Sequence, residues 1–104
     1  MPNSPRLAGK ITLVTGAASG FGAGIARAYA REGATVVLAD LNEEGARSVA
    51  RDCGGLSVAV RCDVTRRADI DAAVQLVRER FGRLDVVVNN AGWTHRNRPL
   101  LEVD

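Results

Sequence analysis

The feature that most constrains the fold of this chain is a charge-free stretch, residues 11–26, that contains four of the eleven glycines. Its first five residues, ITLVT, are apolar or β-branched without a helical period, which predicts a short buried strand. Glycines then mark a turn, and from Phe21 onward the pattern becomes helical until Gly33, which is placed to end the helix in a left-handed conformation. The residues at helical spacing are Ile25, Ala28, Tyr29 and Glu32.

The alternation of strand and helix then repeats along the chain. Apolar runs predict strands at residues 34–39, 56–62 and 84–88, and residues 42–52 and 66–81 form helices with one apolar face. Such strands, separated by helices, indicate a parallel sheet covered on both faces. Right-handed crossovers give the strand order 3-2-1-4. The predicted fold class is therefore α/β, a doubly wound, Rossmann-like parallel sheet with ligands at its carboxyl edge.

The spacing of the glycine turn, T-G-x-x-x-G-x-G over residues 15–22, indicates a phosphate-binding loop. Such a turn lets the backbone approach a pyrophosphate, while the N-terminus of the next helix offers free N–H groups. The spacing is not G-x-G-x-x-G, and no Lys follows the last glycine as a nucleotide-triphosphate loop requires. A turn that serves only packing is the alternative interpretation of the glycines.

Asp40 extends the hypothesis of a phosphate-binding loop to that of a dinucleotide-binding site. It ends the second predicted strand, where a carboxylate can accept hydrogen bonds from both hydroxyls of an adenosine ribose. A 2′-phosphate at that place would meet like charge, and neither Ser19 nor Leu41 supplies a cation to offset it. The sequence therefore favours NAD over NADP. A solvated Asp that begins the next loop remains the alternative.

Composition excludes several other function classes. The 104 residues carry a formal net charge of +2, which is too small and too dispersed to indicate a nucleic-acid or membrane-surface partner. The cysteines, Cys53 and Cys62, lack CxxC spacing, so we expect reduced thiols and no metal site. Without a signal sequence or a run of eighteen apolar residues, the chain is expected to be soluble and cytoplasmic.

Three motifs follow the first, third and fourth predicted strands: the glycine turn, Asp63-Val64, and Asn89-Asn90-Ala91-Gly92. Together they resemble the short-chain dehydrogenase/reductases. The resemblance implies an oxidoreductase that transfers a hydride between NAD and a small ketone or secondary alcohol, and a homo-oligomer in the full-length form. It implies that the turn cradles the pyrophosphate, that Asp40 holds the ribose, and that the other two motifs contact adenine and line the cofactor. The cofactor-binding residues are then Gly16, Ser19, Gly20, Phe21, Gly22, Asp40, Asp63, Val64, Asn90, Ala91 and Gly92.

The same resemblance implies catalytic residues that these 104 residues lack. The family uses a Ser, a Tyr acid/base and a Lys four residues after that Tyr, because a phenol with a pKa of about 10 needs nearby positive charge to act near neutral pH. Here the single Tyr29 is followed four residues later by Gly33, and the single Lys10 precedes the first strand. We therefore expect residues 1–104 to be the N-terminal dinucleotide-binding part of one Rossmann domain, inactive alone.

The C-terminal residues carry further expectations. Residues 100–104 resemble the approach to a fifth helix, and the order 3-2-1-4 makes the fourth strand an exposed edge, which would destabilise the isolated chain. The alternative function is a non-catalytic dinucleotide-binding or assembly module that ends at Asp104. Trp93 and His95 follow the fourth strand, where they either face a substrate or lie in a solvated loop.

Overall fold

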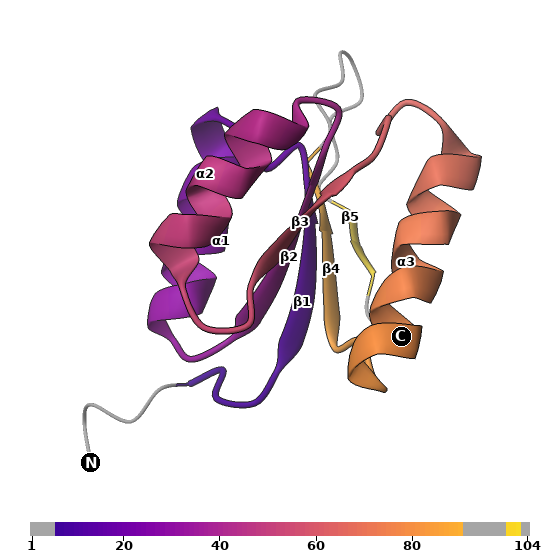
Figure 1. Cartoon of the computed structure of the whole chain (residues 1–104). Coiled ribbons are helices and arrows are strands. Elements are labelled where there is room, and N and C mark those ends of the chain that lie inside the picture. Colours follow the sequence, from indigo (N-terminus) through magenta and orange to yellow (C-terminus); the bar gives the residue numbers. More distant parts are fainter. Residues whose placement is uncertain (1–5, 91–99, 103–104) are drawn as a thin grey trace.

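The computed structural model describes residues 6–90 and 100–102, and strands alternate with helices along most of this length (Figure 1). Every element predicted before residue 90 is present, with its ends shifted by at most two residues. The strands are β1 (Ile11–Thr15), β2 (Thr35–Asp40), β3 (Val58–Arg61), β4 (Val86–Asn89) and β5 (Leu100–Glu102). The helices are α1 (Gly20–Arg31), α2 (Glu43–Cys53) and α3 (Arg67–Phe81).

The strands form one sheet with β1 near its centre. The order is β3-β2-β1-β4-β5, and β1 pairs in parallel with both β2 and β4, while β2 pairs in parallel with β3. This confirms the predicted order 3-2-1-4. All five residues of β1 are buried, as expected for a parallel strand that is covered on both faces.

The last described residues depart from the sequence prediction. Residues 100–102 form β5, which pairs antiparallel with β4, so that Val88 lies opposite Leu101. The approach to a helix that we expected there is instead a strand, and the prediction that β4 is the sheet edge was wrong. An uncovered β4 would present a row of unpaired N–H and C=O groups, and β5 pairs with that side.

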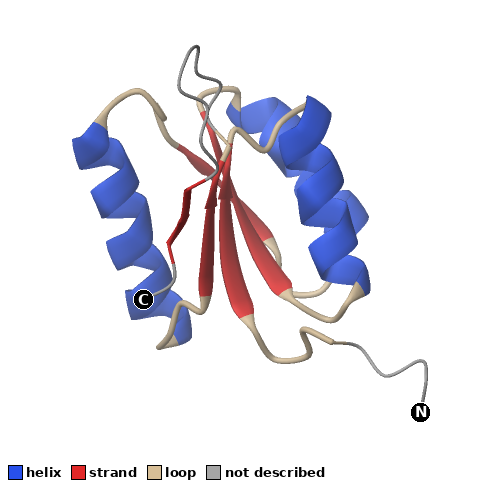
Figure 2. Ribbon diagram, turned by 180° about the vertical axis from the view of Figure 1, so that it is seen from behind, coloured by secondary structure: helices blue, strands red, loops and turns tan. Residues whose placement is uncertain are grey.

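Helices cover both faces of the sheet, with α1 and α2 on one side and α3 on the other (Figures 1 and 2). The two faces bury separate apolar clusters. Val14, Val36 and Leu38 belong to the cluster under α1 and α2, whereas Leu13 and Val37 belong to the cluster under α3. Neighbouring residues of one strand enter different clusters because successive side chains point to opposite faces of a sheet.

The buried residues of α2 and α3 lie on one apolar face of each helix, as expected, and α1 buries small residues. In α1 the buried residues are Gly22, Ala23 and Ala26, whereas Ile25 and Tyr29 are only partly buried. Small residues let the helix approach the sheet closely, and the larger apolar residues flank that contact. The four residues at helical spacing, Ile25, Ala28, Tyr29 and Glu32, are therefore not the ones that α1 buries most deeply.

Membrane-spanning helices and metal clusters are both absent from the described part of the chain. Within residues 6–90 and 100–102, no helix is both long enough and apolar enough to cross a membrane. Those residues also include no group of three or more His, Cys, Asp or Glu side chains arranged to hold a metal ion. Cys53 and Cys62 are free thiols, and burial raises the pKa of each.

Candidate functional site

The glycine turn leaves β1 and opens α1 at the carboxyl edge of the sheet. Gly16 and Gly20 have φ values of 64° and 60°, a backbone region that residues with a side chain rarely adopt. A Cβ on Gly22 would collide with the carbonyl oxygen of Gly16, and a Cβ on Gly16 would lie 2.5 Å from the carbonyl oxygen of Asn90. The turn is held to the sheet because the Gly16 N–H donates to the Ala39 carbonyl at 2.8 Å.

The N-terminus of α1 is open at this turn. Ser19 is the N-cap residue, yet its side chain makes no capping hydrogen bond, and the first turn of the helix contains no acidic residue. Ser19, Gly20 and Phe21 are exposed, Phe21 with 81% of its surface accessible, and nothing lies within 4 Å of a Cβ placed on Gly20. Free N–H groups and the helix dipole at such an end favour an anion.

The N-terminus of α2, unlike that of α1, is capped by its own side chains. Its N-cap residue, Asn42, accepts a hydrogen bond from the Gly45 N–H through Oδ1 at 3.0 Å. Glu43 and Glu44 occupy its first turn and complement the dipole with their own negative charge. The start of α2 is therefore already satisfied by its own side chains, whereas the start of α1 is available to a phosphate group.

Asp40 ends β2 beside the glycine turn, and both of its carboxylate oxygens bind backbone N–H groups. Oδ2 accepts from Ala18 at 2.9 Å, and Oδ1 accepts from Asn42 at 2.8 Å. Each oxygen keeps a further lone pair, since a carboxylate has about four acceptor sites. Asp40 takes part in none of the ion pairs of the described residues, so its charge has no side-chain counterion there. Its orientation is fixed before any ligand binds.

Thr15 organises the site, although sequence reasoning gave it no role of its own beyond its place in the T-G-x-x-x-G-x-G pattern. Its side chain is fully buried, its Oγ1 donates to the Asn89 Oδ1 at 2.8 Å, and the same Oγ1 accepts from the Asn90 N–H at 2.9 Å. These bonds join the ends of β1 and β4. The sequence signal for this role was the place of Thr15 as the first residue of the T-G-x-x-x-G-x-G pattern, at the end of a predicted buried strand.

Asp63 follows β3 and is engaged in a local turn. Its Oδ1 accepts from both the hydroxyl and the N–H of Thr65, at 2.6 and 3.0 Å, and these bonds hold the pKa of the Asp63 carboxyl below its usual range. The Asp63 N–H donates to Asp69 Oδ2 at 3.0 Å. Val64 packs partly buried against the apolar cluster under α3. The turn thus gives both residues fixed positions.

The structure brings the predicted residues of the first, second and fourth strand ends into one hydrogen-bonded unit. Thr15 holds Asn90, Gly16 bonds to the end of β2, and Asp40 holds the turn through Ala18. Asp63 lies after the neighbouring strand, β3, which pairs with β2. The predicted residues Ala91 and Gly92 lie outside the described residues, as do Trp93 and His95.

These features define a class of protein: a doubly wound α/β fold with a glycine turn where the strand order reverses. The model of the short chain dehydrogenase family matches residues 10–104, and the chain belongs to this family.

Curated relatives agree with this assignment. L-fucose dehydrogenase of Oryctolagus cuniculus is 50% identical over 102 residues, which are 98% of this chain and 36% of that protein. D-threitol dehydrogenase of Mycolicibacterium smegmatis is 52% identical over 90 residues, which are 84% of this chain and 35% of that protein. The chain thus spans about a third of the length of these relatives.

Solved structures show the same fold. A 3-ketoacyl-(acyl-carrier-protein) reductase from Brucella melitensis, complexed with NADH, matches with a TM-score of 0.78 and 46% identity. The match covers 88% of this chain and 38% of that one. A hydroxysteroid dehydrogenase from Escherichia coli matches with a TM-score of 0.80 and 36% identity, over 89% of this chain and 41% of the other. The matched proteins are named as dehydrogenases and reductases, which does not favour a non-catalytic module.

Proposed function

We propose that this chain is the cofactor-binding part of an NAD-dependent oxidoreductase that transfers a hydride between the nicotinamide and a ketone or secondary alcohol. The observation that carries the proposal is the Asp40 carboxylate, fixed beside the glycine turn by the Ala18 N–H at 2.9 Å. The Asp40 carboxylate is a negative hydrogen-bond acceptor, and it is joined to the turn that leads into the N-terminus of α1, which favours anions. An adenosine diphosphate moiety has matching chemistry, with ribose hydroxyls at one end and a pyrophosphate at the other.

The residues present fit such a cofactor. The pyrophosphate binds at the start of α1, where the backbone N–H groups of Gly20 and Phe21 and the hydroxyl of Ser19 are free to donate. The remaining lone pairs of Asp40 accept from the ribose hydroxyls. Asp63 and Val64 contact the adenine, and Asn90 lines the cofactor. When bound, NAD supplies the hydride acceptor, and its reduced form supplies the hydride.

Asp40 is also the reason to propose NAD rather than NADP. Two unit charges 4 Å apart near a protein surface repel by about 4 kcal/mol, so a 2′-phosphate beside this carboxylate is disfavoured. No ion pair of the described residues neutralises Asp40. The NADH bound in the Brucella melitensis reductase supports the same choice for a similar chain.

In this proposal, the side chains that transfer the proton are not among these 104 residues. Tyr29 lies on α1 and packs against the apolar cluster beneath that helix, and Lys10 precedes β1, so the two cannot form the Tyr-x-x-x-Lys pair of the family. We propose that the full-length protein supplies a Ser and this pair, acts in the cytoplasm and forms a homo-oligomer. The relatives named for L-fucose and D-threitol support a small hydroxylated substrate.

The direct test is a titration of the full-length protein with NADH and with NADPH, followed by nicotinamide fluorescence. We expect NADH to bind more tightly, and tighter binding of NADPH would contradict the role given to Asp40. A second measurement separates the enzyme from a binding module. The reading frame beyond the codon of Asp104 is expected to encode a Ser and a Tyr-x-x-x-Lys, whereas a stop codon there would support the module.

A further inference from the structure

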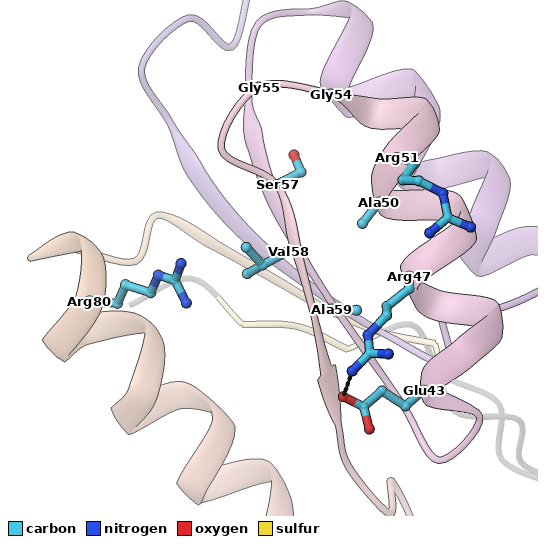
Figure 3. A pocket seen from close by; sticks show the side chains of 10 residues that line it. All are labelled: Glu43, Arg47, Ala50, Arg51, Gly54, Gly55, Ser57, Val58, Ala59 and Arg80. Carbon is cyan, nitrogen blue, oxygen red and sulfur yellow. Dashed lines mark hydrogen bonds and ion pairs between the residues drawn. The ribbon is translucent and has the colours of Figure 1, made fainter.

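A second feature lies along the outer edge of β3, apart from the glycine turn (Figure 3). It is an open groove of about 510 Å³ between α2, β3 and the end of α3. Among the described residues, none of the candidate cofactor-binding residues lines it. Its charged lining residues are Glu43, Arg47, Arg51 and Arg80. The groove is therefore separate from the proposed cofactor site.

The groove is positively charged on both sides of the strand. Arg47 and Arg51 come from α2, and Arg80 comes from α3, which covers the opposite face of the sheet (Figures 1 and 3). Arg47 forms an ion pair of 3.1 Å with Glu43, but the ion pairs of the described residues include neither Arg51 nor Arg80. Three arginines and one glutamate leave an excess of positive charge at this edge.

The strand between these arginines is itself open. β3 is the last strand in the order β3-β2-β1-β4-β5, so within the described part of the chain its outer side has no strand partner. Val58 and Ala59 line the groove and are only partly buried. Alternate residues of an edge strand point their N–H and C=O groups outward, where another extended segment can pair with them.

The positive charge of the groove determines which kind of extended segment can pair with β3. A second copy paired edge to edge would bring its own three arginines against these, and like charges at close range are repulsive. A strand rich in carboxylates would instead be attracted on both faces. Because successive side chains of a strand point to opposite faces, consecutive acidic residues would meet Arg51 on one side and Arg80 on the other.

We propose that the β3 edge binds an extended acidic segment of a partner protein, which adds to the sheet as a further strand. Backbone hydrogen bonds to β3 supply much of the affinity, and the arginines select a segment with neighbouring carboxylates. The same arginines disfavour pairing with apolar or basic strands, which protects the β3 edge from non-specific association.

Arg51 and Arg80 also have a structural role that the test must separate from binding. Each lies in the last turn of its helix, where a cation complements the helix dipole. Arg31 holds the corresponding position in the last turn of α1 and does not line the groove. Arg31→Glu is therefore a matched control, since it has the same effect on a helix dipole at a place outside the groove.

The experiment uses the full-length protein and a fluorescein-labelled peptide with four consecutive glutamates flanked by valine and threonine. Fluorescence anisotropy measures its binding at low and high salt. We expect binding that weakens with salt, and a loss of roughly tenfold in affinity in the double variant Arg51→Glu/Arg80→Glu but not in Arg31→Glu. The same peptide with every backbone nitrogen of the glutamate run methylated keeps its charge, has no N–H group to donate along either edge and should not bind.

Several results would overturn the proposal. Equal binding of the methylated peptide would show simple charge attraction, and equal weakening by Arg31→Glu would show a loss of helix stability. Tighter binding of a single-stranded RNA that the double variant abolishes would assign the groove to nucleic acid. A dimer that the double variant dissociates would assign it to a second copy. If the double variant fails to fold, Arg51→Gln/Arg80→Gln removes the charges without reversing them and should still weaken peptide binding.

Discussion

Asp40 and Ala18 are joined by a hydrogen bond of 2.9 Å between the carboxylate Oδ2 and the backbone N–H, which ties the end of β2 to the glycine turn. The proposed ribose acceptor therefore also shapes the proposed phosphate loop. A substitution at Asp40 is expected to change both parts of the site together. That coupling distinguishes this carboxylate from an acidic residue that only contacts a ribose.

Replacing Asp40 with Ala removes the ribose acceptor and the anchor of the turn. Hydrogen bonds to a charged group contribute about 1.5–3 kcal/mol each, so NADH affinity of the full-length protein should fall by roughly tenfold to a hundredfold or more. NADPH affinity should fall less, because the repulsion of the 2′-phosphate disappears too. Titration by fluorescence measures both. Asp52→Ala, which removes an exposed partner of Arg27, should leave NADH affinity unchanged, and an equal loss there would discredit the interpretation.

Two glycines of α1 give a matched pair of substitutions. A Cβ on Gly22 would collide with the Gly16 backbone, so Gly22→Ala should displace the turn, weaken NADH binding and lower the unfolding free energy by about 1–3 kcal/mol. A Cβ on Gly24, within the same helix, would meet nothing closer than 4 Å. Gly24→Ala should raise stability by about 0.5–1 kcal/mol and leave binding intact. Urea unfolding of both variants checks this, and the opposite order would contradict the role of Gly22.

Thr15→Val keeps the shape of the side chain but removes its hydroxyl. The Asn90 N–H and the Asn89 Oδ1 would then lose their partner in a partly buried place, at a cost of about 1–3 kcal/mol in unfolding free energy. Thr15→Ser retains the hydroxyl and should restore most of the NADH affinity lost in Thr15→Val. Denaturant unfolding and NADH titration of both variants measure the effect. Equal NADH affinity in the two variants would show that the hydroxyl does not position Asn90.

Asp85 makes stability depend on pH. Hydrogen bonds from the Arg83 side chain and the Ile11 N–H hold the pKa of the Asp85 carboxyl below its usual range. A lowered carboxyl pKa adds stability above the unfolded value of about 3.9, and this is lost as pH falls toward the folded value. The unfolding free energy of the wild type should therefore fall more steeply below about pH 4 than that of Asp85→Asn.

Chemical denaturation at a series of pH values measures the two curves, which should converge in acid. Asp71→Asn is the control, since Asp71 makes only an exposed pair of 3.4 Å with Arg67. Its curve should follow that of the wild type. Parallel curves for the wild type and Asp85→Asn would show that the pKa of Asp85 does not differ between the folded and unfolded states.

Much of the candidate site was predictable because its signals are local. The glycine turn and Asp40 occupy the ends of apolar runs, and strand ends are where a doubly wound sheet binds ligands. The partners of Thr15 were not predictable, because Thr15 is separated from Asn89 and Asn90 by 74 and 75 residues. The contact exists only once β1 and β4 pair.

The sequence alone determined the α/β class, the strand order and the turn, since these follow from apolar periodicity, glycine conformations and the handedness of crossovers. Only the tertiary structure determined which residues contact the ends and the edges of the strands. Folding placed β5 beside β4, brought arginines of two helices to the open edge of β3, and joined Asp40 to Ala18 by a hydrogen bond. Such contacts depend on how the segments pack in three dimensions, and local sequence patterns do not encode that geometry.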